Sequence, residues 1–378
     1  MNNYSKDVRD LVYLVSCAVN KEKPNTEACN KMDLKAVYDL AQYHTLTSAA
    51  AFALEKAIEL PREFDQAKKK AIHKLSHFDI ERVKILAALE QNGVWYLPLK
   101  GILLKSFYPK AAMREMSDND ILCDKNKMDV VKSVMDGFGY TCLQYDLYNH
   151  DVYQKPPTMD FEMHRELFPH DEMPVFAEYY DSISDRMIKD EGNNYGYHLS
   201  DEDFYIYILC HMNKHYNHGG TGLRSLLDVY VFNRARYDSM DKGYLSQELE
   251  KLGLTEYEQN TRVLAEKLFT GKELTDDEQK MLAYYIESGT TGTVEHSEYN
   301  SLTRSLKGDD SGKSKRKYLL KRFFISGKAL KNQYPTVYKY KFLYPLLILY
   351  RPIKGAVQRP KEIIKEVKRV KKYKSKKD

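Results

Sequence analysis

Two aspartates stand two residues apart where the chain enters a short apolar run, in the segment Ser117–Cys123 (SDNDILC). Because side chains alternate along a strand, Asp118 and Asp120 are expected on one face and Asn119 on the other. Two carboxylates in one small volume raise each other's proton affinity unless a cation lies between them, and oxygen ligands suit Mg²⁺ or Mn²⁺. The pair therefore predicts a divalent-metal site, although a D-x-D pair alone is also typical of a turn or a solvated strand edge.

A second acidic segment, Met159–His164 (MDFEMH), alternates strictly between apolar and polar residues. Its polar face carries Asp160, Glu162 and His164, so this strand can bring a third carboxylate to the first pair. We expect Glu162 to be that carboxylate, with Asp160 as the alternative two residues earlier. His164 is expected to orient Glu162, to bind substrate, or to be a hydrogen-bonded structural histidine.

Positively charged residues lie near these acids in the sequence. Lys100 and Gly101 end an apolar run, and backbone beside a glycine at the start of a helix can approach a phosphate group closely. Arg114 is expected either to neutralise phosphate groups or to pair with Glu115 or Asp118. Two metal ions about 4 Å apart, held by three carboxylates, can bind a triphosphate and activate an attacking oxygen.

A later helical segment adds further polar residues. His211 and His215 are four residues apart, a spacing that zinc sites use, but the glutamate of an HExxH motif is missing. These histidines, with Arg224 and Asp228, are expected either near a nucleotide or acceptor or as interior helix contacts. In the second case Asp228 pairs with Arg224 at a spacing of four residues.

The order of these motifs resembles an uncharacterised bacterial nucleotidyltransferase family with an LKG…R…DxD…ExH pattern, a branch of the polymerase-β-like superfamily. The resemblance covers about residues 30–355. It rests on LKG, FYP, Arg114, SDNDIL and DFEMH, then on HMNKH, GLRSLLD and FFISGKALKNQYP.

The resemblance implies roles for the individual residues. Asp118, Asp120 and Glu162 would be the catalytic metal ligands, for Mg²⁺ or Mn²⁺. The residues implied in nucleotide binding are Lys100, Gly101, Arg114 and Arg224, although Lys100-Gly101 stands where many superfamily members have Gly-Ser. The residues expected at the substrate or behind the ligands are Asp160, His164, His211 and Asp228.

The implied reaction moves a nucleoside monophosphate from a nucleoside triphosphate, such as ATP, to a hydroxyl acceptor and releases pyrophosphate. The acceptor is a small molecule, an RNA or a protein. Two alternatives stay open: a catalytically silent nucleotide- or RNA-binding module of the same fold, and a toxin-like transferase that acts on tRNA or protein.

The elements that position these residues follow from the periodicity of the sequence. An α+β fold is predicted, with a small α/β unit flanked by helical regions. The resemblance implies that this unit is a polymerase-β-like nucleotidyltransferase core with a small mixed sheet. The expected strands are 94–99, 117–123, 140–145, 151–154 and 158–164, and the polar segment Ser288–Lys317 is expected to be a loop. The expected domains are an N-terminal helical region (1–92), the catalytic core (93–200), a C-terminal helical domain (201–350) and a basic tail (351–378).

The composition is that of a soluble globular protein, with 43% hydrophobic and 30% charged residues among 378. Five scattered cysteines without a CxxC pair predict reduced thiols, and we find neither a signal peptide nor an apolar run of about 18 residues. A cytoplasmic location is expected.

Residues 359–378 hold ten Lys or Arg against three acids. This predicts a solubilising tail, or one that contacts an anionic membrane surface or an RNA backbone.

Overall fold

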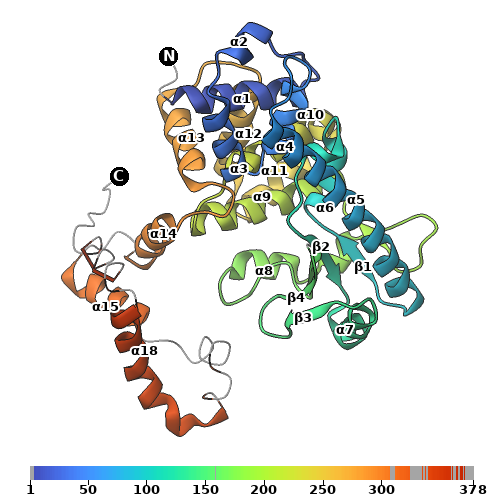
Figure 1. Ribbon diagram of the computed structural model, residues 1–378. Helices are drawn as coiled ribbons and strands as arrows, with labels where there is room; N and C mark the ends of the chain where they lie inside the picture. Colours follow the sequence, from blue (N-terminus) through green and yellow to red (C-terminus); the bar gives the residue numbers. More distant parts are fainter. Residues whose placement is uncertain are drawn as a thin grey trace. The chain divides into compact units, whose positions relative to one another are not determined.

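The computed structural model contains a five-stranded mixed sheet (Figure 1). The structure describes residues 4–157, 159–306, 311–323 and 339–358, with single residues and pairs between 334 and 370. The strand order is β1-β2-β5-β4-β3, and β2 and β5 are parallel while the other neighbours are antiparallel. The strands are β1 (Tyr96–Pro98), β2 (Asn119–Cys123), β3 (Thr141–Gln144), β4 (His150–Lys155) and β5 (Met159–His164).

One face of the sheet is apolar and is covered by two helices, α5 (Arg62–Gln91) and α7 (Met128–Gly137). Ile121 of β2 and Phe161 of β5 pack there against Phe78 and Ile85 of α5, and all four side chains are fully buried. Because side chains alternate along each strand, Asp120 and Glu162 point to the opposite face. The predicted polar face, with Asp120 and Glu162, therefore lies on the side of the sheet opposite the hydrophobic core formed with α5 and α7.

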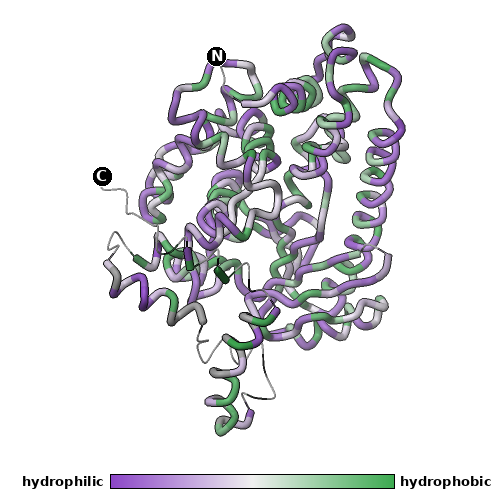
Figure 2. The backbone as a smooth tube through the Cα atoms, turned by 60° about the vertical axis from the view of Figure 1, so that its left-hand side comes forward, coloured by the Kyte–Doolittle hydropathy of each residue, from purple (hydrophilic) through white to green (hydrophobic). Residues whose placement is uncertain are grey.

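Helices from distant parts of the chain share one large hydrophobic core. Helix α1 (Lys6–Val19) packs against both α4 (Thr47–Leu54) and α12 (Thr255–Phe269), and α10 (Leu223–Arg236) packs on α12. Hydrophobic and hydrophilic residues are interspersed along the backbone (Figure 2). Helix α4 is buried almost all round, with seven of its eight residues buried. The other helices of this part are α2 (Thr26–Asn30), α3 (Leu34–Tyr43), α6 (Gly101–Leu104), α8 (Pro174–Tyr180), α9 (Asp201–His218), α11 (Lys242–Lys251) and α13 (Asp276–Ser288).

The contacts divide the chain into two compact units. The first is Met1–Tyr216 with Gly220–Thr291, and the second is Asn217–Gly219 with Gly292–Asp378. The second unit contains α14 (Val294–Leu306), α15 (Gly312–Phe323) and α18 (Tyr344–Gln358). The prediction of a loop over Ser288–Lys317 is therefore wrong, because Leu302 and Leu306 of α14 are buried against Tyr318 of α15.

The α+β class and the five predicted strands are confirmed, with ends that differ by up to two residues. A short hairpin of β6 (Ile188–Lys189) and β7 (Tyr197–His198) was not predicted.

All five cysteines are free thiols. Within the described part of the chain, no helix is long and apolar enough to span a membrane. Half of the basic tail, including residues 371–378, lies outside the described residues, and so do the contacts predicted for it.

Candidate functional site

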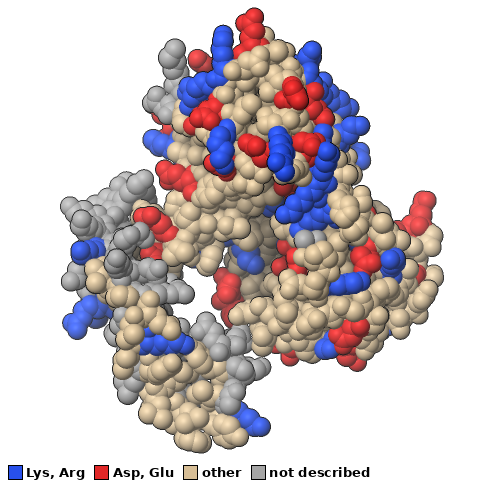
Figure 3. All heavy atoms as spheres, in the orientation of Figure 1, with Lys and Arg blue, Asp and Glu red and all other residues tan. Residues whose placement is uncertain are grey.

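A pocket of about 400 Å³ opens on the polar face of the sheet within the first unit. Strands β2 and β5 form its floor, and helices α6, α9 and α10 supply its walls. Over the face drawn in Figure 3, acidic and basic side chains are interspersed on the helical part. The lining residues that carry charge or a titratable ring are Lys100, Arg114, Asp118, Asp120, Glu162, His211, His215, Arg224 and Asp228.

The parallel pairing of β2 and β5 brings the two acidic segments together. Asp120 and Glu162 are register partners on these strands, and both line the pocket. Asp118 lies one residue before β2 and lines the pocket as well. Asn119 points the other way and accepts a hydrogen bond of 3.0 Å from Arg82 of α5. The predicted alternation is therefore present, and the three carboxylates lie in one pocket.

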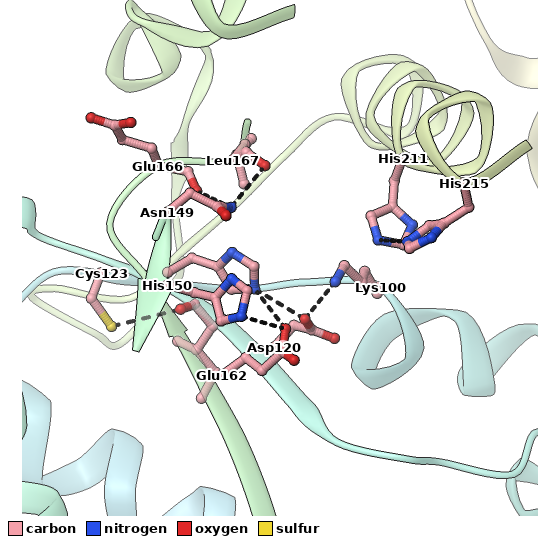
Figure 4. Close-up of polar contacts among 12 residues, drawn as sticks. Lys100, Asp120, Cys123, Asn149, His150, Glu162, Glu166, Leu167, His211 and His215 are labelled. Atoms are coloured by element: carbon pink, nitrogen blue, oxygen red, sulfur yellow. Dashed lines mark hydrogen bonds and ion pairs between the residues drawn. The ribbon is translucent and has the colours of Figure 1, made fainter. Parts of the chain in front are cut away.

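Asp120 is held by two positively polarised groups. Lys100 Nζ lies 2.5 Å from its Oδ1, and His164 Nε2 lies 3.0 Å from the same oxygen (Figure 4). Burial alone would raise the pKa of Asp120, but Lys100 and His164 outweigh that effect and hold the pKa well below its usual range. Lys100 precedes α6 with φ +46°, a left-handed conformation that non-glycine residues rarely adopt.

The other two carboxylates differ in their electrostatic surroundings. Burial and the negative charges of Asp120 and Glu162 raise the pKa of Asp118 to about 6, although Lys100 and Arg224 act against this. The pKa of Glu162 is lowered instead, because the His164 imidazole 3.6 Å away, together with Lys100 and His150, outweighs its burial and the charge of Asp120. Asp118 is thus the carboxylate of the cluster whose ionised form the surroundings disfavour, mainly through burial.

Arg114 forms a two-point ion pair with Asp228 of α10. Its Nη2 lies 3.0 Å from Oδ2 and its Nε lies 3.2 Å from Oδ1, and Tyr108 donates a further hydrogen bond of 2.7 Å to Oδ1. The predicted partners of Arg114, the carboxylates of Glu115 and Asp118, are wrong. So is the predicted local pair of Arg224 with Asp228, since Asp228 accepts its hydrogen bonds from Arg114 and Tyr108.

Gly101 borders the same pocket, and its lack of a side chain has a specific use. A Cβ at this position would lie 2.6 Å from Arg114 Nη1 and 2.6 Å from the Sδ of Met116. The guanidinium of Arg114 thus occupies the space that a side chain would take. Gly101 was expected to let the backbone approach a phosphate group. In the structure it makes room for the Arg114 side chain beneath the start of α6.

The remaining predicted residues are divided between the pocket and its surroundings. Arg224 lines the pocket, and burial lowers its pKa. His211 and His215 line it from α9, with their Nε2 atoms 3.1 Å apart, and burial lowers the pKa of His211 well below its usual range. Asp160 accepts a hydrogen bond of 2.9 Å from Gln154 and does not line the pocket, so Glu162 is the third carboxylate there.

His150 is a residue at this site that the sequence analysis missed. It lies on β4 directly opposite His164 of β5, and its Nε2 is 3.7 Å from Glu162 Oε2. The sequence shows an isolated histidine before Asp151, and only the pairing of β4 with β5 brings it to the carboxylates. Strand register is not visible in a single sequence, so no signal could have found it.

Comparison with known proteins gives one family. Residues 30–270 match the family described as an uncharacterised nucleotidyltransferase, and this range contains every residue of the pocket except Thr290 and Thr291. No curated protein matches the chain, and no solved structure does.

Proposed function

The chain belongs to the uncharacterised nucleotidyltransferase family, and on that basis we propose that it moves a nucleoside monophosphate from a nucleoside triphosphate, such as ATP, to a hydroxyl acceptor. The acceptor oxygen bonds to the α-phosphorus, the bond from that phosphorus to the oxygen bridging to the β-phosphate breaks, and pyrophosphate leaves. The observation that carries the proposal is the single pocket containing Asp118, Asp120 and Glu162 beside Lys100.

Asp118, Asp120 and Glu162 suit a hard divalent cation, Mg²⁺ or Mn²⁺. They offer carboxylate oxygens, the donors that such ions prefer. The raised pKa of Asp118 supports the same assignment, since an added positive charge would favour its ionised form. When bound, such an ion supplies charge neutralisation on the phosphates and a lower pKa for the acceptor hydroxyl.

The other residues of the pocket would hold the nucleotide. We assign phosphate contacts to Lys100 and Arg224, which line the pocket as cations near the three acids. Ile208 and Met212 of α9 line the same pocket and offer an apolar surface for the base. Glu162, whose pKa is lowered, is ionised at neutral pH and can take the proton of the acceptor hydroxyl.

We assign to Arg114 and Gly101 an indirect role at the nucleotide site: they position the residues that contact the nucleotide. The pair with Asp228 fixes Arg114 beneath Gly101 and so fixes the start of α6, from which Lys100 reaches the acids. Positioning of this kind affects transfer strongly, because phosphate-transfer catalysis depends on placement and charge.

One observation favours a second function. Lys100 Nζ, 2.5 Å from Asp120, already gives that carboxylate a positive partner. A catalytically silent nucleotide- or RNA-binding module could use this internal pair in place of a metal. The acids Asp118 and Glu162 speak against it, since Lys100 leaves the pKa of Asp118 raised.

The test is incubation of the purified protein with each of the four α-³²P-labelled nucleoside triphosphates, Mg²⁺ or Mn²⁺, and a cell lysate divided into RNA, protein and small-molecule fractions. Label in one fraction names the acceptor class. The label should fall to background with Asp118→Ala and with Asp120→Asn. Asp136→Ala is the control, because this exposed residue pairs with Lys132 on the far helix α7.

Two results would contradict the proposal. Transfer that continues unchanged in Asp118→Ala would remove this pocket as the catalytic site. If no fraction is labelled while calorimetry still detects nucleotide binding, the silent module becomes the better description.

A further inference from the structure

Two imidazoles and one carboxylate meet at the edge of the acidic pocket, and we infer that His150, Glu162 and His164 bind a divalent transition-metal ion of the Zn²⁺ or Co²⁺ type. One ligand atom from each residue lies within 4.8 Å of the other two. This site goes beyond the proposed reaction, because it concerns a second class of cation and can be tested without any nucleotide.

The backbone ladder fixes the positions of the three residues. The antiparallel pairing of β4 with β5 places His150 opposite His164, with ring centroids 4.9 Å apart and planes inclined by 41°. Glu162 precedes His164 by two residues on the same strand face. Because all three side chains come from paired strands, the ligand set is held more rigidly than one on loops would be.

The spacing of the ligand atoms fits a small tetrahedral ion. Nε2 of His150 and Nε2 of His164 lie 3.7 and 3.6 Å from the same Glu162 Oε2. These distances are too long for hydrogen bonds. Ligand atoms about 2.0–2.1 Å from a tetrahedral zinc are roughly 3.4 Å apart, so each imidazole needs only a small movement toward the carboxylate. The ligand nitrogens of the two imidazoles lie within 4.8 Å of each other and would also have to approach to bind one ion.

The donor types select the class of metal. Imidazole nitrogen suits Zn²⁺, Co²⁺ and similar ions, whereas Mg²⁺ prefers oxygen ligands. Two histidines with one carboxylate therefore differ from the three carboxylates assigned to Mg²⁺ or Mn²⁺. The two sets share Glu162, and His164 Nε2 also lies 3.0 Å from Asp120. An ion on His164 would replace that hydrogen bond and change the charge beside the acidic cluster.

The experiment is a titration of the full-length, nucleotide-free protein with Co²⁺ in a large excess of Mg²⁺, followed by the visible d–d absorption of bound Co²⁺. The wild type should bind one Co²⁺ with nitrogen and oxygen ligands. His150→Gln should weaken this binding at least tenfold, about the loss that removal of a metal-site partner causes. The matched control is His198→Gln, since His198 also pairs with a carboxylate, Asp190, but lies on β7 away from the pocket.

Other histidines and the cysteines give outcomes that would overturn the inference. His211 and His215 have their Nε2 atoms 3.1 Å apart, so binding that is lost in His211→Gln and kept in His150→Gln would place the ion there. A thiolate charge-transfer band would place it on a cysteine, and absence of Co²⁺ binding by the wild type would also reject the site. If His150→Gln does not fold, wild-type crystals soaked in zinc provide the test. An anomalous zinc peak beside His150 and His164 would support the inference, and a peak elsewhere would reject it.

Discussion

Arg114 and Asp228 join the loop before β2 to helix α10 through two hydrogen bonds, of 3.0 and 3.2 Å, between side chains that are both buried. Removing the arginine leaves a buried carboxylate with Tyr108 as its remaining donor. We therefore expect Arg114→Ala to lower the free energy of unfolding by about 3–5 kcal/mol, measured by urea denaturation. Arg114→Lys should cost less, because it keeps the charge and loses the two-point geometry.

Arg236→Ala is the control for this prediction. Arg236 pairs with Asp201 at 3.5 Å, and both side chains are largely exposed. The change should be less than about 0.5 kcal/mol. Equal effects of Arg114→Ala and Arg236→Ala would show that the buried pair does not stabilise the fold.

Asp118 makes stability depend on pH in a defined direction. Its pKa is about 6 in the folded protein, above the ordinary value of 3.8. The folded state thus holds more protons than the unfolded state between these values, and the contribution of Asp118 to stability falls as the pH rises through this window. In metal-free protein at about pH 7.5, Asp118→Asn should raise stability by about 1 kcal/mol, a Tm increase of about 1–2 °C for a chain of this length.

The same ionisation governs metal binding. Mg²⁺ or Mn²⁺ should raise the Tm of the wild type above about pH 6 and should raise it less at lower pH, where Asp118 is protonated. Thermal unfolding of the wild type and Asp118→Asn across this range tests both statements. A lower Tm for metal-free Asp118→Asn at about pH 7.5 would contradict them.

Gly101 should tolerate no side chain. In Gly101→Ala the new Cβ would lie 2.6 Å from both Arg114 Nη1 and the Sδ of Met116, so one of them must move. We expect a loss of about 1–3 kcal/mol in unfolding free energy and a lower transfer rate, because the start of α6 shifts. Gly137→Ala is the matched control, since a Cβ there meets nothing within 4 Å, and alanine in a helix should leave stability equal or higher.

Lys100 should compete with a metal for Asp120. Lys100→Gln removes the positive charge 2.5 Å from that carboxylate. Nucleotide-free binding of Mn²⁺, measured by electron paramagnetic resonance, should become tighter by roughly tenfold, a typical effect of one neighbouring charge. Transfer should fall, because Lys100 is assigned to the phosphates. Lys132→Gln, at an exposed pair on α7, should alter neither quantity, and weaker Mn²⁺ binding in Lys100→Gln would contradict the competition.

The sheet and the acidic face could be predicted because they depend on local alternation. The strict pattern of Met159–His164 puts Glu162 and His164 on one face, and the apolar residues that alternate with them lie in the core with α5. The helix over Val294–Leu306 could not be predicted in this way. Its sequence is polar, and its stability comes from burial of Leu302 and Leu306 against another helix.

Two relationships at the site depend on tertiary pairing, which a single sequence does not contain. Asp228 has a suitable partner four residues away in Arg224, yet its ion pair forms with Arg114, 114 residues distant in the chain. His150 reaches Glu162 only through the register of β4 with β5. For Asp228 local spacing suggested a different partner, and for His150 it suggested none; long-range packing determines both arrangements.

The core shared by α1, α4, α10 and α12 also determines when the pocket can form during synthesis. The side chain of Asn20, directly after α1, donates a hydrogen bond of 3.0 Å to the backbone oxygen of Phe269, 249 residues later. A ribosome must therefore complete α12 before α1, which also packs on α4, has all its contacts in this core, and contacts so distant in sequence slow folding. Until then the first helices expose apolar faces, so a nascent chain of this protein is a natural client for chaperones.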